Sequence, residues 1–344
     1  GLRRAGRRLC RDLGPAIELP RAEDGGHEPL ALERIRVGVV DTGIDAGHRA
    51  FEGVRIHTGD VRGSIPGTVD GNEDDDDDDD DGDGDGTERG GARDRVGHGT
   101  FVCGVLAGVP AADAAFAGGV VRITGDASLH VVRASVSVRE TIEPDHVVAL
   151  GMLLDAGAEV INLSYEGARE DILENALVAE AVDKGVVVVA AAGNRNDADI
   201  PYDASRPYAE RQRADRLRRS FPAACPGVVA VAASDYDGRI ASFSGRGEHV
   251  ACSAPGIEVR SAVPRNPYSM YFHEQHAGFA VLSGTSFAAP VVAGVCASLK
   301  ERYPHLSGPQ LRDLLATASA QTGEGVGLVQ VASTLELCRE RFGS

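Results

Sequence analysis

The sequence predicts an α/β domain of three layers, in which helices cover both faces of a mostly parallel central β-sheet. Two observations lead to this class. Apolar runs of strand length alternate with helical segments along most of the 344 residues, as in parallel strands joined by crossover helices. The runs are continuously apolar rather than alternating, which is expected when a parallel sheet is buried on both faces.

The expected elements follow one another in a regular order. The strands are short and apolar, and they cover residues 36–40, 129–138, 159–163, 186–190 and 228–232. The helices between them cover residues 145–155 and 171–184. Gly185 ends the second helix, because glycine is favoured just after a helix C-terminus.

Four segments lie outside this pattern. Residues 1–34 lack periodicity and are expected to be an N-terminal extension, and residues 337–344 a C-terminal tail, so that the domain covers 35–336. Inside the domain, an acidic low-complexity insertion covers about 70–88 and an Arg-rich insertion about 195–220. Adjacent aspartates repel one another and have nothing to bury, which predicts a disordered surface loop for the first insertion.

Charge and composition exclude several classes of protein. The formal net charge is −17, but eleven of the acidic residues lie between Glu73 and Asp85, and without them it would be −6. The rest of the chain therefore gives no indication of a nucleic-acid partner. No run approaches the ~20 apolar residues of a membrane span. The first thirty residues lack the apolar core of a signal peptide, and the compartment, secreted or cytoplasmic, stays open, as does the oligomeric state.

The cysteines give no sign of a metal site. Six are few for this length and include no C-x-x-C pair, so a zinc site is not expected. Cys103 and Cys296 fall in the helices expected after two of the motifs below, where they would be buried thiols. Pairing of Cys225 with Cys252 is left open by the spacing.

Four short segments contain residue types that suit acyl transfer. Asp41 ends a buried strand, His98 lies in Gly-His-Gly-Thr, Ser286 in Ser-Gly-Thr-Ser, and Asn194 ends Ala-Ala-Ala-Gly-Asn. A serine hydroxyl needs a base within hydrogen-bond reach, and histidine suits that role near neutral pH. A buried carboxylate orients the imidazole. A side-chain amide and the serine's own N–H at a helix N-terminus would bind the oxyanion.

Each segment alone has an ordinary explanation. Asp-Thr-Gly and Gly-Asn are common turn chemistry, Gly-His-Gly can be a loop, and Ser-Gly-Thr-Ser can be a helix N-cap. The functional interpretation depends on all four occurring in one order, each at its expected strand or helix end.

In these motifs the chain resembles the subtilases, the subtilisin-like serine proteases, over about residues 35–335. The resemblance implies the subtilisin-like fold, with Asp41 as orienting acid, His98 as general base, Ser286 as nucleophile and Asn194 as oxyanion donor. The order Asp, His, Ser along the chain is the order found in subtilisin, and the three roles follow from this resemblance. Sedolisins share the fold but use a Glu and an Asp oxyanion residue, so His98 and Asn194 decide against them.

The resemblance also implies a cleft in which a polypeptide substrate binds as an added β-strand. The residues implied to bind the substrate lie just after two of the expected strands: Ser164, Tyr165, Glu166, Gly167, Ala192 and Gly193.

Two residues depart from the family pattern. Phe101 stands where the segment after the catalytic histidine usually reads His, and altered local packing is expected rather than lost activity. Glu166 stands where the family usually has glycine. Its carboxylate either disfavours acidic substrate side chains or points outward into solvent.

The charged insertions carry two further hypotheses. Residues 81–86 have acids at positions one, three and five and glycine at six, as in an EF-hand loop, but position twelve would be Ala92. Structural calcium is therefore an open alternative to a solvated acidic loop, with no ligands placed. Opposite charge also suggests that the acidic loop pairs with residues 206–219 and limits access to the cleft.

The sequence thus predicts a serine endopeptidase that hydrolyses polypeptides through an acyl-enzyme on Ser286 and needs no cofactor for its chemistry. The rival interpretation is a catalytically silent subtilase that serves as a binding or scaffold module, and labelling by a fluorophosphonate separates the two. Among enzymes, a processing protease with one precursor competes with a broad degradative one, and the insertions favour the dedicated kind.

Overall fold

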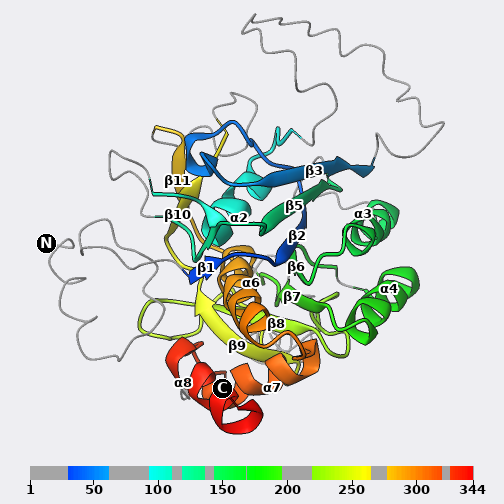
Figure 1. The fold of residues 1–344 in the computed structure, drawn as a ribbon, viewed down its shortest axis with the longest axis vertical. Helices are drawn as coiled ribbons and strands as arrows, with labels where there is room; N and C mark the ends of the chain where they lie inside the picture. The colour runs from blue at the N-terminus through cyan, green and yellow to red at the C-terminus, as the bar shows by residue number, and fades with distance from the viewer. Residues whose placement is uncertain are drawn as a thin grey trace, which may run out of the picture.

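The computed structural model describes residues 30–61, 93–110, 118–135, 143–167, 169–195, 219–264, 277–319 and 326–343. Its centre is a parallel sheet of seven strands in the order β3-β5-β2-β6-β7-β8-β9 (Figure 1). The strands are β2 (Arg36–Asp41), β3 (Ile56–Asp60), β5 (Ser128–Arg133), β6 (Val160–Leu163), β7 (Val187–Ala191), β8 (Val229–Ser234) and β9 (Val250–Pro255). The predicted parallel sheet is confirmed.

Helices cover both faces of this sheet. On one face lie α2 (His98–Ala107), α6 (Thr285–Arg302) and α7 (Gly308–Ala318), with α8 (Val331–Phe342) packed against α7. On the other lie α3 (Glu143–Asp155) and α4 (Ile172–Asp183), side by side (Figure 1). Successive strand residues face opposite sides, so Val39 joins the core beneath α2 and α6, whereas Val40 joins the core beneath α3 and α4. The three predicted layers are confirmed.

Shorter elements complete the fold at its edges. β1 (Leu30–Leu32) pairs in parallel with β4 (Val121–Ile123), β10 (Val259–Ala262) pairs antiparallel with β11 (Phe279–Leu282), and η2 (Arg49–Phe51) is a single 3-10 turn. These elements are not predictable from the sequence, because three or four residues carry too little periodicity to identify a strand.

The folded unit extends past both boundaries expected from the sequence. β1 lies within the expected N-terminal extension, and Leu32 is fully buried in the core. At the other end, α8 continues through most of the expected tail, and Cys338 is fully buried. Residues 1–29, the acidic insertion at about 70–88 and most of the Arg-rich insertion lie outside the described residues.

Local sequence explains where α4 begins and ends. The Asp171 side chain accepts a hydrogen bond of 2.7 Å from the backbone N–H of Glu174 and so caps the N-terminus. Gly185, with φ of 80°, takes the left-handed conformation that ends the helix, as predicted. The chain then enters β7, the strand that leads to Asn194.

The five cysteines of the described segments are all buried and free, so Cys225 and Cys252 do not pair. In the same part of the chain, no helix is both long enough and apolar enough to cross a membrane.

Candidate active site

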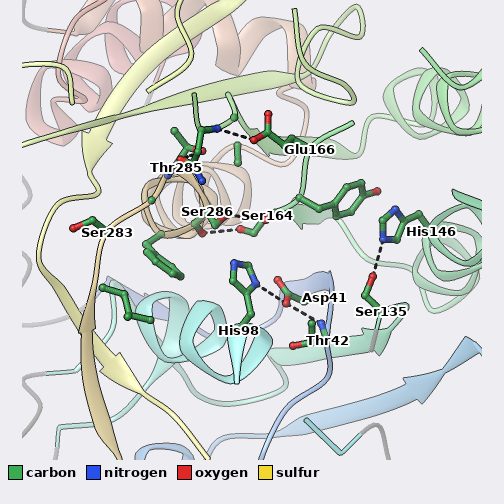
Figure 2. Close-up of a pocket in the computed structure, with 17 residues that line it drawn as sticks. Asp41, Thr42, His98, Ser135, His146, Ser164, Glu166, Ser283, Thr285 and Ser286 are labelled. Atoms are coloured by element: carbon green, nitrogen blue, oxygen red, sulfur yellow. Dashed lines mark hydrogen bonds and ion pairs between the residues drawn. The ribbon is translucent and has the colours of Figure 1, made fainter. Parts of the chain in front are cut away.

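The four residues of the predicted catalytic set converge at one edge of the sheet. Asp41 ends β2, Asn194 follows β7, His98 is the first residue of α2, and Ser286 is the second residue of α6. Carboxyl ends of parallel strands meet at one edge, which is where ligands bind in open α/β sheets. All four line a single cleft of about 290 Å³ (Figure 2).

Asp41 and His98 form a buried, directed pair. His98 Nδ1 lies 2.8 Å from Asp41 Oδ1, and that oxygen also accepts a hydrogen bond of 2.8 Å from the Thr42 N–H. The other ring nitrogen of His98 faces Ser286 (Figure 2). Burial acts to lower the pKa of His98, but the charge and hydrogen bond of Asp41 and the charge of Asp94 outweigh it and raise the pKa above its ordinary value.

Asp94 is a second buried carboxylate, which the sequence analysis missed. Its Oδ1 accepts from Thr42 Oγ1 at 2.9 Å and from the N–H groups of Val96 and Gly97 at 3.0 and 2.7 Å. Its Oδ2 accepts from the N–H and hydroxyl of Thr100 at 2.8 and 2.6 Å. Burial and the charge of Asp41 raise the pKa of Asp94, and the hydrogen bonds from Thr100 and Gly97 oppose that effect by stabilising the ionised form. Asp94 thereby ties the turn before α2 to the end of β2.

Ser286 exchanges two hydrogen bonds with Ser164. The Ser286 hydroxyl donates to the Ser164 carbonyl at 2.9 Å, and the Ser164 hydroxyl donates to the Ser286 carbonyl at 2.8 Å. The second bond has a sequence cause: Pro290 lies four residues on in α6 and lacks the N–H that would otherwise bond the Ser286 carbonyl. Ser164 therefore satisfies an acceptor that the proline leaves open.

Asn194 caps α6 from outside the helix. Its Oδ1 accepts hydrogen bonds from the N–H of Thr285 at 3.0 Å and from the Thr285 hydroxyl at 3.1 Å. In the described part of the chain no hydrogen bond occupies Asn194 Nδ2, so that amide remains available as a donor. It lies beside the N-terminus of α6, where the helix dipole favours negative charge.

The six residues implied to bind the substrate divide into two groups. Ser164, Tyr165, Glu166 and Gly193 line the cleft. Gly167 pairs its backbone with Phe221, at 2.7 and 3.0 Å, and the Ala192 carbonyl accepts a hydrogen bond of 2.7 Å from the Ser220 hydroxyl. Gly167 and Ala192 are not among the residues that line the cleft.

Glu166 turns inward rather than out to solvent. Its Oε1 accepts a hydrogen bond of 2.8 Å from the backbone N–H of Asn194, and its Oε2 forms an ion pair with Arg195. The outward-pointing alternative from the sequence analysis is therefore not the conformation of this structure.

One wall of the cleft contains a second histidine, which the sequence analysis also missed. The His146 ring stacks on Tyr165 at 3.9 Å between centroids, and its Nε2 lies 3.2 Å from the Ser135 hydroxyl (Figure 2). Burial lowers the pKa of His146 to about 4, so the ring is neutral near pH 7. The Tyr165 hydroxyl donates to Glu174 at 2.7 Å.

Phe101 packs beside the site. Its ring is fully buried, and the ring centroid lies 4.3 Å from that of Phe287. The Phe287 centroid in turn lies 5.6 Å from that of His98. Phe101 thus packs against Phe287, the residue after Ser286, and whether this differs from the packing in other subtilases stays a prediction.

The described segments contain no group of three or more His, Cys, Asp or Glu side chains arranged to hold a metal ion. The acidic insertion, where the sequence left calcium open, lies outside them.

Comparison with known proteins identifies the family. The Subtilase family model matches residues 33–333. Subtilisin DY of Bacillus licheniformis is 27% identical over 326 residues, which are 94% of this chain and 97% of the subtilisin. A mutant of the protease domain of PatA covers 92% of this chain and 100% of its own at a TM-score of 0.65 and 23% identity. A cold adapted subtilisin-like serine proteinase covers 86% of this chain and 87% of its own, at a TM-score of 0.61 and 23% identity. The chain belongs to the subtilase family and is a subtilisin-like serine endopeptidase.

Proposed function

We propose that Ser286 is the nucleophile of this peptidase, His98 its general base and Asp41 the residue that orients His98. The observation that carries the proposal is the convergence of the three side chains in one cleft, with the Asp41–His98 hydrogen bond of 2.8 Å already formed. The Ser286 hydroxyl turns from the Ser164 carbonyl to His98 Nε2 when the substrate binds, since catalytic hydrogen bonds are often unformed before binding.

The reaction then follows two steps. Ser286 Oγ bonds to the substrate carbonyl carbon while its proton passes to His98 Nε2, and His98 returns the proton to the departing amine nitrogen as the C–N bond breaks. Water next attacks the acyl-enzyme and gives a proton to His98, which passes it to Ser286 Oγ as the acid is released. Asp41 keeps the proton on Nδ1 and stabilises the imidazolium in both steps.

Asn194 and the N–H of Ser286 are the proposed oxyanion donors. Asn194 Oδ1 accepts two hydrogen bonds from Thr285, which fix the plane of the side-chain amide. Nδ2 of the same amide is therefore held in place and available to donate to the oxyanion. Asn194→Ala is expected to lower turnover by ~10²–10³, the effect of removing the equivalent donor in subtilisin.

The proposed substrate is a polypeptide whose backbone lies along residues 164–166. Ser164, Tyr165, Glu166 and Gly193 all line the cleft. We propose no nucleic-acid partner, and the proposed reaction requires only one copy of this chain.

Reaction with an alkyl fluorophosphonate tests the proposed nucleophile. The native chain is expected to form a Ser286–phosphorus bond with loss of fluoride, located by peptide mass spectrometry. Ser286→Ala and His98→Ala are the controls and should abolish labelling. Labelling that persists in Ser286→Ala, or at another residue, would contradict the assignment.

No metal or other cofactor is proposed for the chemistry, because serine, imidazole and carboxylate together supply nucleophile and base. The native chain incubated with EDTA is expected to label at an unchanged rate. If EDTA abolished labelling while the circular dichroism spectrum stayed the same, the metal-free mechanism would be wrong.

A further inference from the structure

The carboxylate of Glu166 lies directly against the cleft face of Gly193. A Cβ atom added to Gly193 would come within 2.1 Å of Glu166 Oε2 and 2.9 Å of its Cδ. The Glu166 side chain therefore fills the space between the segments that follow β6 and β7, space that the missing side chain of Gly193 leaves open.

Arg195 holds this carboxylate in place. The Arg195 side chain is only 6% exposed, and its Nη1 bonds both Glu166 Oε2 and, at 3.1 Å, the Asn194 carbonyl. The second oxygen, Oε1, accepts from the Asn194 N–H. Arg195 is buried whereas the Glu166 side chain is 31% exposed, so separating the pair is costly chiefly because it leaves a buried guanidinium without its carboxylate.

The position of His98 shows which part of the substrate meets Glu166. His98 must protonate the departing amine, so the leaving group lies on the His98 side of Ser286. The acyl part, whose oxygen faces Asn194, lies on the other side. Glu166 and His98 stand on opposite sides of Ser286 (Figure 2). The residue just before the scissile bond therefore lies on the same side of Ser286 as the Glu166 carboxylate.

We propose that the Glu166–Arg195 pair restricts the residue immediately before the scissile bond to a small, uncharged side chain. This inference rests on the proposed roles of Ser286 and Asn194 and names the substrate class of that site. Large side chains meet occupied space, and acidic ones meet a carboxylate. Basic ones would have to displace Arg195 from a pair that is already formed.

The test uses peptide substrates that differ only in the residue before the cleaved bond: Ala, Phe, Lys or Glu. The native chain should cleave the Ala peptide with kcat/KM at least tenfold above each of the others. In Glu166→Gly, the ratio of Phe to Ala cleavage should rise at least tenfold, because the side chain that fills the space is gone. An unchanged ratio would overturn the proposal.

Glu166→Gln separates volume from charge. Glutamine keeps the size of the side chain and an oxygen for the Asn194 N–H, so discrimination against Phe should persist. Discrimination against the Glu peptide should fall severalfold, because the charge of Arg195 is no longer balanced. If Glu166→Gln accepted Phe as readily as Glu166→Gly does, filling of the space would not be the cause.

Fluorophosphonate labelling, which involves no side chain before a scissile bond, accompanies each variant. If the native chain failed to label at Ser286, the proposed catalytic roles would be wrong. If it labelled normally but cleaved the Phe and Ala peptides equally fast, the restriction alone would be wrong. Labelling of Glu166→Gly shows that the variant has folded with its nucleophile in place.

Discussion

Asp94 lies outside the proposed catalytic set but fixes the backbone on which two of its members, Asp41 and His98, are placed. It is only 1% exposed and accepts five hydrogen bonds that join the turn before α2 to Thr42 and Thr100. An acceptor so fully used has no substitute of the same shape, because an asparagine would present an N–H to the Thr100 donors.

Asp94→Asn is therefore expected to lower the free energy of unfolding by about 3 kcal/mol, since hydrogen bonds to a charged group are worth about 1.5–3 kcal/mol each. Urea unfolding measures the change. Asp126→Asn is the matched control: the Asp126 side chain is 91% exposed in a 3.4 Å pair with Arg55, so its loss should cost less than about 1 kcal/mol. Equal effects of the two substitutions would contradict the role given to Asp94.

The pH dependence of activity follows from His98. Its pKa is raised above the ordinary value, chiefly because Asp41 outweighs the effect of burial. As the proposed general base, His98 must be neutral to act, so kcat/KM should fall with decreasing pH through an apparent pKa above 6.5. His146, with a pKa of about 4, should add no step near neutral pH.

Asp94 contributes to that raised pKa through its charge. Where Asp94→Asn remains folded, the acidic limb of its pH profile should shift to lower pH relative to the native chain. A loss of stability alone would lower the amplitude without moving the limb, so the shift separates the electrostatic role from the structural one. If the acidic limb of the native chain lay at or below pH 6.5, the charges of Asp41 and Asp94 would not outweigh the effect of burial on the pKa of His98.

At the scale of elements, the close approach of α2 to the end of β2 depends on Gly99. A Cβ there would lie 2.1 Å from the Gly43 carbonyl oxygen and 3.2 Å from Asp41 Cβ. Backbone cannot move aside as a flexible side chain can, so α2 itself would have to shift, and His98 is its first residue.

Gly99→Ala should destabilise the fold by about 1–3 kcal/mol through overpacking and lower kcat by roughly 10²-fold through displacement of His98. Gly151 in α3 provides the control, because a Cβ there meets only Leu177 Cδ2, at 3.9 Å. Gly151→Ala should gain about 0.5–1 kcal/mol, as alanine favours helices, with activity unchanged. Thermal unfolding and peptide turnover are measured on both variants. If Gly99→Ala were as stable and as active as Gly151→Ala, the role given to Gly99 would be wrong.

The elements that could be predicted from the sequence are those with strong local signals. β2, β6, β7 and β8 are continuous apolar runs, and α4 carries both a capping aspartate and a terminating glycine. β1 and β4 have three residues each and exist because they pair with one another across the fold. Such pairing is a tertiary property, and no local pattern encodes it.

At the scale of the whole molecule, the core buries the thiols of Cys225 and Cys252 and so protects them from reagents in solution. Burial raises the pKa of Cys252 to about 12, and burial with nearby carboxylates does the same for Cys225. Thiolates are the reactive form, so both should resist iodoacetamide at pH 8 in the native chain and react after unfolding in urea. Mass spectrometry of the alkylated peptides reads this out, and equal rates in the two states would show that the core opens readily.

The candidate site was predictable to the same extent as the fold. Asp41, His98, Asn194 and Ser286 stand in motifs that can be recognised together, from their order along the chain and their places at strand and helix ends. Their supports cannot, because each joins segments far apart in sequence: Ser164 compensates for Pro290 in α6, and Arg195 determines the direction of Glu166. The sequence therefore predicts that Glu166 lies in the cleft but not which way its side chain points.

The parallel sheet also has a consequence for the newly made chain. β2, the third strand in the sheet, carries Asp41, which precedes Ser286 in α6 by 245 residues in the order of synthesis. At about 5–20 residues per second, tens of seconds separate the two. A ribosome-bound chain therefore contains Asp41 and His98 well before Ser286, the proposed nucleophile, and until Ser286 is added it cannot form an acyl-enzyme.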